Sequence, residues 1–150
     1  MVPDRIERET LINAPLERVW EVITAAEHLG RWFGDAGAEI DLRPGGAMVL
    51  RWTDAAHRGR VVAVEPPTRF SYRWAPFDDP GGDEPVEGNS TLVEFTLHPD
   101  GEATRLRVVE SGFASLSASE QQRARNFDGN TEGWQRETDE LRAYAEKVVV

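Results

Sequence analysis

The sequence predicts a single α+β domain, residues 1–150, in which a curved antiparallel sheet of about six or seven strands wraps around a long C-terminal helix. Three observations lead to this fold class. Segments of alternating apolar and polar residues follow one another across short turns, which favours antiparallel pairing. Two short helical segments come after the first of these strands. The long amphipathic helix comes last, so its apolar stripe has to pack against the sheet.

The N-terminal part is predicted to contain one strand and two short helices. Residues 5–12 alternate with a period of two, as a half-buried strand does. Pro15 suits the first turn of a helix, and apolar residues then recur at helical spacing. A second short helix is predicted for about residues 26–31.

Four β segments are predicted next. They cover residues 37–43, 48–53, 59–65 and 69–74. The turns between them are expected at residues 44–46, 54–57 and 66–67, where Gly, Pro and Asp gather. Alternation is strongest in the last segment, where Phe70, Tyr72 and Trp74 share one face.

Residues 75–89 are acidic and rich in Pro and Gly, which predicts a long loop that could act as a lid over a pocket. Two further strands follow this loop. One places Val93, Phe95 and Leu97 on a single face, and the other places Leu106, Val108 and Glu110 together.

The C-terminal third changes from strand to helix periodicity. Ser117 and Glu120 fit a capping box for a short helix that runs to about residue 126. Residues 128–130 (Asp-Gly-Asn) predict a break, after which a final helix covers about residues 131–147. One stripe of this helix contains Trp134, Thr138, Leu141, Ala145 and Val148.

Composition narrows the function classes. The 150 residues carry a formal net charge of −10, which disfavours binding to nucleic acid and to anionic membrane surfaces. There is no cysteine, so a disulfide framework or a thiolate site is excluded. The N-terminus lacks the apolar core of a signal peptide, and no run is long enough for membrane insertion. We therefore expect a cytoplasmic protein.

Several motifs, taken in order, resemble the START-like (SRPBCC) superfamily. They are residues 13–20 (NAPLERVW), 27–33 (EHLGRWF), 44–46 (PGG), 59–74 with its EPPTRF core, 110–113 (ESGF) and 132–134 (EGW). Within the superfamily they are similar to the branch named for the activator of the ninety-kilodalton heat-shock protein ATPase. The resemblance covers about residues 5–147. It implies a helix-grip fold with an interior cavity that holds lipids, polyketides or other apolar molecules in relatives.

The co-chaperones of that branch carry a separate N-terminal domain that clamps the chaperone. This chain begins directly at the START-like strand, so chaperone activation is not expected.

The main functional hypothesis is the binding of a small hydrophobic molecule, lipid-like or aromatic, in an internal cavity. No catalysed reaction is assigned to this cavity. Ligand pockets are mostly apolar and aromatic with a few polar groups. The candidate ligand-binding residues are Trp32, Phe33, Met48, Leu50, Trp52, Phe70, Tyr72, Trp74, Phe95, Val108, Glu110, Trp134, Thr138 and Leu141. The alternative is that most of these residues only pack in the hydrophobic core and do not contact a ligand. A protein-interaction or chaperone-linked module is the second hypothesis, with its protein partner unknown.

A cyclase or hydratase that uses Glu110 as acid or base is the third hypothesis. Glu110 shares a strand face with Leu106 and Val108, so it should point inward, where loss of solvation raises a carboxyl pKa. The alternative for Glu110 is an ion pair with an arginine at the end of the sheet. For Thr138 the alternative to ligand contact is a hydroxyl bond to its own helix.

The sequence contains no catalytic or metal-binding signature. His28, His57 and His98 lack the spacing of metal ligands, and surface or turn positions are expected for them. No nucleophile elbow, phosphate loop or dinucleotide fingerprint occurs. We therefore expect a binding domain rather than an enzyme, with no metal and no cofactor.

Overall fold

The computed structural model describes residues 3–53, 55–74 and 88–147. The elements, in chain order, are β1 (Arg5–Ile12), α1 (Leu16–Thr24), α2 (Ala26–Trp32), β2 (Ala38–Ile40), β3 (Ala47–Trp52), β4 (Ala55–Glu65), β5 (Arg69–Trp74), β6 (Thr91–Asp100), β7 (Ala103–Ser111), the 3-10 turn η1 (Phe113–Ser115) and α3 (Glu120–Lys147). The predicted lid, residues 75–89, lies almost wholly outside the described residues, as does Val148.

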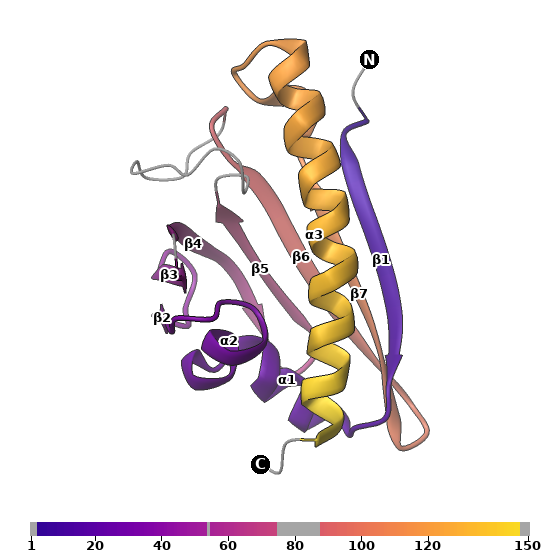
Figure 1. Cartoon of the computed structure of the whole chain (residues 1–150). Helices are drawn as coiled ribbons and strands as arrows, with labels where there is room; N and C mark the ends of the chain where they lie inside the picture. Colours follow the sequence, from indigo (N-terminus) through magenta and orange to yellow (C-terminus); the bar gives the residue numbers. More distant parts are fainter. Residues whose placement is uncertain (1–2, 54, 75–87, 148–150) are drawn as a thin grey trace.

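Within the described residues the strands form one sheet of seven, in the order β1-β7-β6-β5-β4-β3-β2. Every neighbouring pair is antiparallel, as the short turns predicted. The long helix α3 runs across one face of this curved sheet, and α1 and α2 cover the same face near the C-terminal end of α3 (Figure 1). This is the helix-grip arrangement that the sequence predicts.

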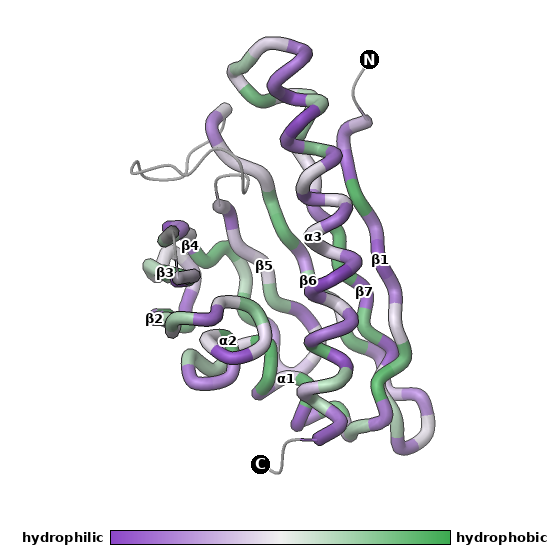
Figure 2. Tube along the Cα trace, in the orientation of Figure 1, coloured by the Kyte–Doolittle hydropathy of each residue, from purple (hydrophilic) through white to green (hydrophobic). Residues whose placement is uncertain are grey.

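The core lies between α3 and the sheet. Figure 2 shows hydrophobic and hydrophilic positions alternating along the strands, whereas α3 is mostly hydrophilic. Phe70, Tyr72 and Trp74 on β5 are all buried, and Trp134 and Leu141 on α3 meet that side of the sheet. A narrow apolar stripe is therefore sufficient to hold the long helix.

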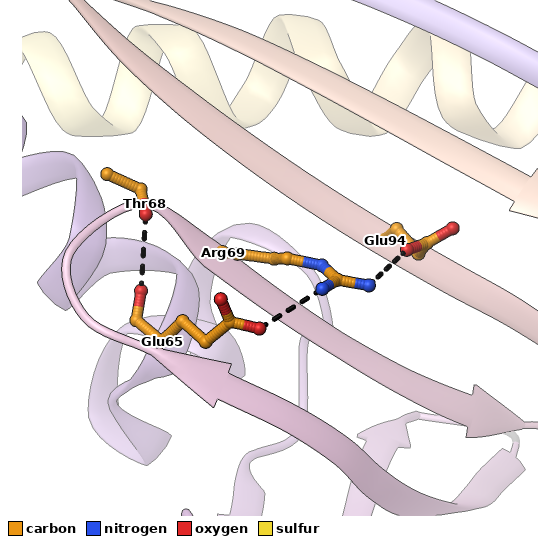
Figure 3. Close-up of polar contacts among 4 residues, drawn as sticks. All are labelled: Glu65, Thr68, Arg69 and Glu94. Carbon is orange, nitrogen blue, oxygen red and sulfur yellow. Dashed lines mark hydrogen bonds and ion pairs between the residues drawn. The ribbon is translucent and has the colours of Figure 1, made fainter.

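The opposite face of the sheet is polar. Arg69 at the start of β5 donates to Glu65 on β4 and to Glu94 on β6, each at 3.1 Å (Figure 3). The Thr68 hydroxyl donates to the Glu65 carbonyl at 3.5 Å in the turn between β4 and β5. Exposed ion pairs of this kind contribute little to stability, but they keep this face solvated.

The predicted helix break at residues 128–130 is wrong. α3 is one continuous helix of 28 residues. Asn130 does not cap a helix, because its side chain is buried and donates a hydrogen bond to Glu110 on β7. The helix begins after Ser119, whose hydroxyl accepts from the backbone N–H of Gln122 at 3.1 Å, so the capping residue is not Ser117.

The predicted turn at residues 54–57 is also misplaced, since β4 already includes His57. The β3–β4 pairing continues to Trp52 opposite Ala55, so β4 begins at Ala55.

Gly129 lies inside α3, and a Cβ added there would meet no atom within 4 Å. Gly129→Ala should therefore raise the free energy of unfolding by about 0.5–1 kcal/mol, because alanine loses less backbone entropy in a helix. Chemical denaturation measures this change. The matched control is Gly30→Ala in α2, where the new Cβ would lie 2.8 Å from the Gly37 Cα and should destabilise the fold. A Gly129→Ala variant less stable than wild type would contradict the continuous helix.

Candidate functional site

Glu110 on β7 is fully buried and is bound by four side chains. Oε1 accepts from Asn130 Nδ2 at 2.9 Å and from Trp134 Nε1 at 2.8 Å, both on α3. Oε2 accepts from Trp74 Nε1 on β5 at 2.8 Å and from the hydroxyl of Thr91 on β6. The carboxyl group thus joins three strands to the helix.

The environment of Glu110 acts on its pKa in two directions. Burial raises the pKa of the Glu110 carboxyl above its ordinary value, and the four hydrogen bonds lower it in part. The predicted raised pKa is confirmed, but the alternative of an arginine partner is wrong within the described residues. Each oxygen already accepts two hydrogen bonds, so a substrate would have to displace a protein donor to reach it.

The predicted inward aromatic residues pack against one another. The Phe33 ring stacks on Trp32 with centroids 4.9 Å apart and lies 5.3 Å from Trp74 and 5.4 Å from Trp134. It also meets the Trp52 ring edge-to-face at 5.6 Å. The aromatic side chains around Phe33 therefore fill this part of the protein interior.

A pocket of about 300 Å³ opens beside this cluster, between the end of α2, the end of β3 and the middle of α3. We call it the Trp52 pocket. Its lining residues are Arg31, Trp32, Phe33, Gly34, Asp35, Trp52, Arg136, Glu137 and Glu140. Asp35 is held at its rim by accepting from the Thr53 backbone N–H at 2.7 Å.

Glu137 is the buried ionisable group of the Trp52 pocket. Its side chain is 5% exposed, Oε1 lies 3.9 Å from Arg136 Nε, and Oε2 has no hydrogen-bond partner among the described residues. Burial is the main cause that raises the pKa of Glu137 to about 8, with a smaller contribution from Glu140. At neutral pH the group is therefore mostly a neutral carboxylic acid.

Sequence reasoning missed Glu137. The available signal was its position three residues after Trp134 and four before Leu141, which places it on the core-facing stripe of α3. A charged residue at a stripe position calls for a functional explanation.

Tyr72 is a second buried polar group without a partner among the described residues. Burial raises the pKa of its phenol well above the ordinary value, and the nearby Glu110 and Glu137 carboxyl groups add to this. Tyr72 therefore lies within electrostatic range of both carboxyl groups.

The structure separates the predicted ligand-binding residues into two groups. Trp32, Phe33 and Trp52 line the Trp52 pocket. The other apolar candidates are buried in the core, namely Met48, Leu50, Phe70, Tyr72, Trp74, Phe95, Val108, Trp134 and Leu141. The Thr138 hydroxyl donates to the Trp134 carbonyl at 2.7 Å, which is the helix bond named as the alternative.

Two of the three histidine expectations are wrong. His28 is buried in α2, with Nδ1 2.6 Å from the Tyr144 hydroxyl. His57 is buried in β4, and its ring lies 5.2 Å from that of Trp52. Both rings face other aromatic side chains, so they are parts of the packed interior. His98 is exposed near the end of β6, as expected for a surface position.

A larger hollow of about 840 Å³ lies between residues 13–17 and residues 99–103. Its charged side chains, Glu17, Asp100 and Glu102, are all exposed. The Trp52 pocket is the better candidate because it combines aromatic walls with a buried polar group. Across residues 3–53, 55–74 and 88–147, no cluster of acidic or histidine side chains is suited to holding a metal ion, and no helix could span a membrane.

Removal of the Glu110 carboxyl should strongly destabilise the protein. Glu110→Ala leaves two indole N–H groups and one amide without an acceptor in the interior, so we expect the free energy of unfolding to fall by about 3 kcal/mol or more. Glu110→Gln should lose less, since the amide oxygen still accepts. Denaturant titration measures both. The exposed Glu102→Ala is the control and should change stability by less than about 0.5 kcal/mol. A loss below about 1 kcal/mol for Glu110→Ala would refute the anchoring role.

The raised pKa of Glu137 makes stability depend on pH. Between the unfolded value of 4.5 and the folded value of about 8, the folded protein keeps a proton that the unfolded chain gives up, so stability falls as pH rises through this window. Glu137→Gln cannot ionise and should become the more stable protein by at least about 1 kcal/mol at pH 8. Denaturation at pH 5 to 9 tests this. Glu132→Gln, an exposed change on the same helix, should keep the wild-type slope.

Sequence and structure comparisons agree with the geometry. The family described as Activator of Hsp90 ATPase homolog 1-like protein matches residues 13–146. A search of curated proteins gives no significant match.

Several solved structures share the fold. Protein MLL2253 from Mesorhizobium loti has a TM-score of 0.77 at 23% identity, with 97% of this chain and 99% of that chain covered. DynU16, from the dynemicin biosynthetic locus, has a TM-score of 0.75 at 23% identity over 97% of this chain and 48% of that chain. The Aha1 dimer from Colwellia psychrerythraea has a TM-score of 0.73 at 17% identity, with 98% of each chain covered.

At these identities the structural similarity establishes the fold, whereas the family match covers most of the chain. The chain therefore belongs to the Activator of Hsp90 ATPase homolog 1-like family, within the START-like superfamily.

Proposed function

We propose that this protein binds a small, largely apolar or aromatic molecule in the Trp52 pocket. The observation that carries the proposal is the combination of aromatic walls with a buried carboxyl group. The walls come from Trp32, Phe33 and Trp52, and the carboxyl group is that of Glu137, whose Oε2 has no hydrogen-bond partner among the described residues. Ligand sites have this composition, in which apolar walls supply contact area and a few polar groups fix orientation. A cytoplasmic location remains part of this proposal.

The family adds support of a general kind. Its members share a fold that hosts ligand binding and cyclase-like roles, and fold alone does not select between them. One similar structure, DynU16, comes from a biosynthetic locus, which is in keeping with a small organic ligand.

The geometry gives less support to the other two hypotheses. Both oxygens of Glu110 are occupied by protein donors, so it is poorly placed as an acid or base. The large hydrophobic side chains most exposed among the described residues are Leu11, Leu42 and Val62, which offer little area for a protein partner.

A fragment titration followed by ¹H–¹⁵N NMR tests the binding proposal. A library of small aromatic and aliphatic compounds should shift the indole N–H signal of Trp52 and the backbone signals of residues 33–35 and 136–140. Trp52→Ala should weaken the best compound by about tenfold or more, since it removes one aromatic wall.

Glu102→Ala, beside the larger hollow at residues 99–103, should leave that affinity unchanged. Shifts confined to residues 13–17 and 99–103, or no shifts with any compound, would contradict the proposal.

A further inference from the structure

The Trp52 pocket has an acidic wall in which one buried carboxyl oxygen lacks a hydrogen-bond donor among the described residues. Glu137 is one of the lining residues, and its buried Oε2 accepts no hydrogen bond from the described residues. An acceptor buried in this way costs free energy unless a ligand or water supplies a donor. The position therefore favours an incoming group that can donate hydrogen bonds.

The charges that face Glu137 come from three segments. Glu140, one turn further along α3, and Asp35, in the middle of the α2–β2 connection, are both acidic and both disfavour ionisation of Glu137. Arg136 opposes them, but it is two-thirds exposed and approaches Oε1, not Oε2. Arg31 also lines the pocket, on the exposed surface of α2.

The balance of these groups favours a cation over an anion. An anionic ligand would gain only from two exposed guanidinium groups, whose interactions are screened by water. The acidic side chains of the same pocket wall would also repel an anionic ligand. A cation at Oε2 would interact favourably with all three carboxyl groups, and the net charge of −10 attracts cations to the whole molecule.

The aromatic walls suit the same class of ligand. Trp and Phe rings attract cations through their π faces, and Trp is the strongest of the side chains in this respect. They also supply contact area for an apolar body attached to the charged group.

We propose that the Trp52 pocket selects an organic cation, a protonated amine carried on an aromatic or apolar body, and that Glu137 is the residue that binds the ammonium group. This inference rests on the proposed function and specifies its ligand class.

Binding of such a cation has a thermodynamic signature. Glu137 is mostly protonated at pH 7, and a neighbouring ammonium group favours the ionised carboxylate. Uptake of the amine should therefore release most of one proton at pH 7, because Glu137 with a pKa of about 8 is mostly protonated there. A neutral ligand should release none.

Three probes with the same phenyl group separate the possibilities. These are 2-phenylethylamine, 2-phenylethanol and 3-phenylpropanoate, which present a cation, a neutral hydroxyl and an anion. Isothermal titration calorimetry at pH 7 in two buffers of different ionisation enthalpy gives both the affinity and the number of protons released. The amine should bind at least about tenfold more tightly than the other two and should release the proton.

Glu137→Gln should reduce the affinity for the amine to that for the alcohol and abolish proton release. Glu132→Gln, the same substitution on an exposed position of α3, should change neither. Equal affinity for the three probes, or amine binding without proton release in the wild-type protein, overturns the cation inference and leaves the binding function standing. Failure of all three probes to shift the Trp52 signals in the NMR experiment overturns the inference, and failure of the whole fragment library overturns the proposed function as well.

Discussion

The carboxyl group of Glu110 is the interaction on which the arrangement of helix and sheet depends. Its four donors lie on β5, β6 and α3, while Glu110 itself lies on β7. A buried polar network of this kind adds less net stability than an apolar core would, but it accepts only one arrangement of its members. The hydrogen bonds therefore fix how far along the sheet α3 lies and which of its faces is turned inward.

This constraint also decides where space remains. Trp74 and Trp134 point their indole N–H groups at Glu110, and the rings behind those groups pack against Phe33. The centre of the fold is consequently occupied by protein. The Trp52 pocket forms at the margin of this cluster, about one helical turn beyond Trp134, where charged side chains join the aromatic ones.

The two buried glutamates of this fold therefore differ in the number of hydrogen-bond donors around them. Glu110 has a donor for each lone pair that it offers, and its role is structural. Glu137 has one distant guanidinium and an oxygen without a donor, so its stable form at neutral pH is the protonated one. Burial alone does not identify a functional acid, because the number of donors around the group determines whether it can still respond to a ligand.

The sequence by itself determined the fold class, the strand order along the chain and the apolar stripe of α3, because these depend on local periodicity. It also predicted that Glu110 points inward, since strand alternation fixes the side of the sheet. The continuous path of α3 through Gly129 and Asn130 was decided only by the tertiary structure, as Asn130 reaches a partner 20 positions away on β7. Local capping preference could not compete with that buried hydrogen bond. The same holds for Glu137, whose raised pKa depends on burial and on Asp35, and both arise only when other segments fold around α3.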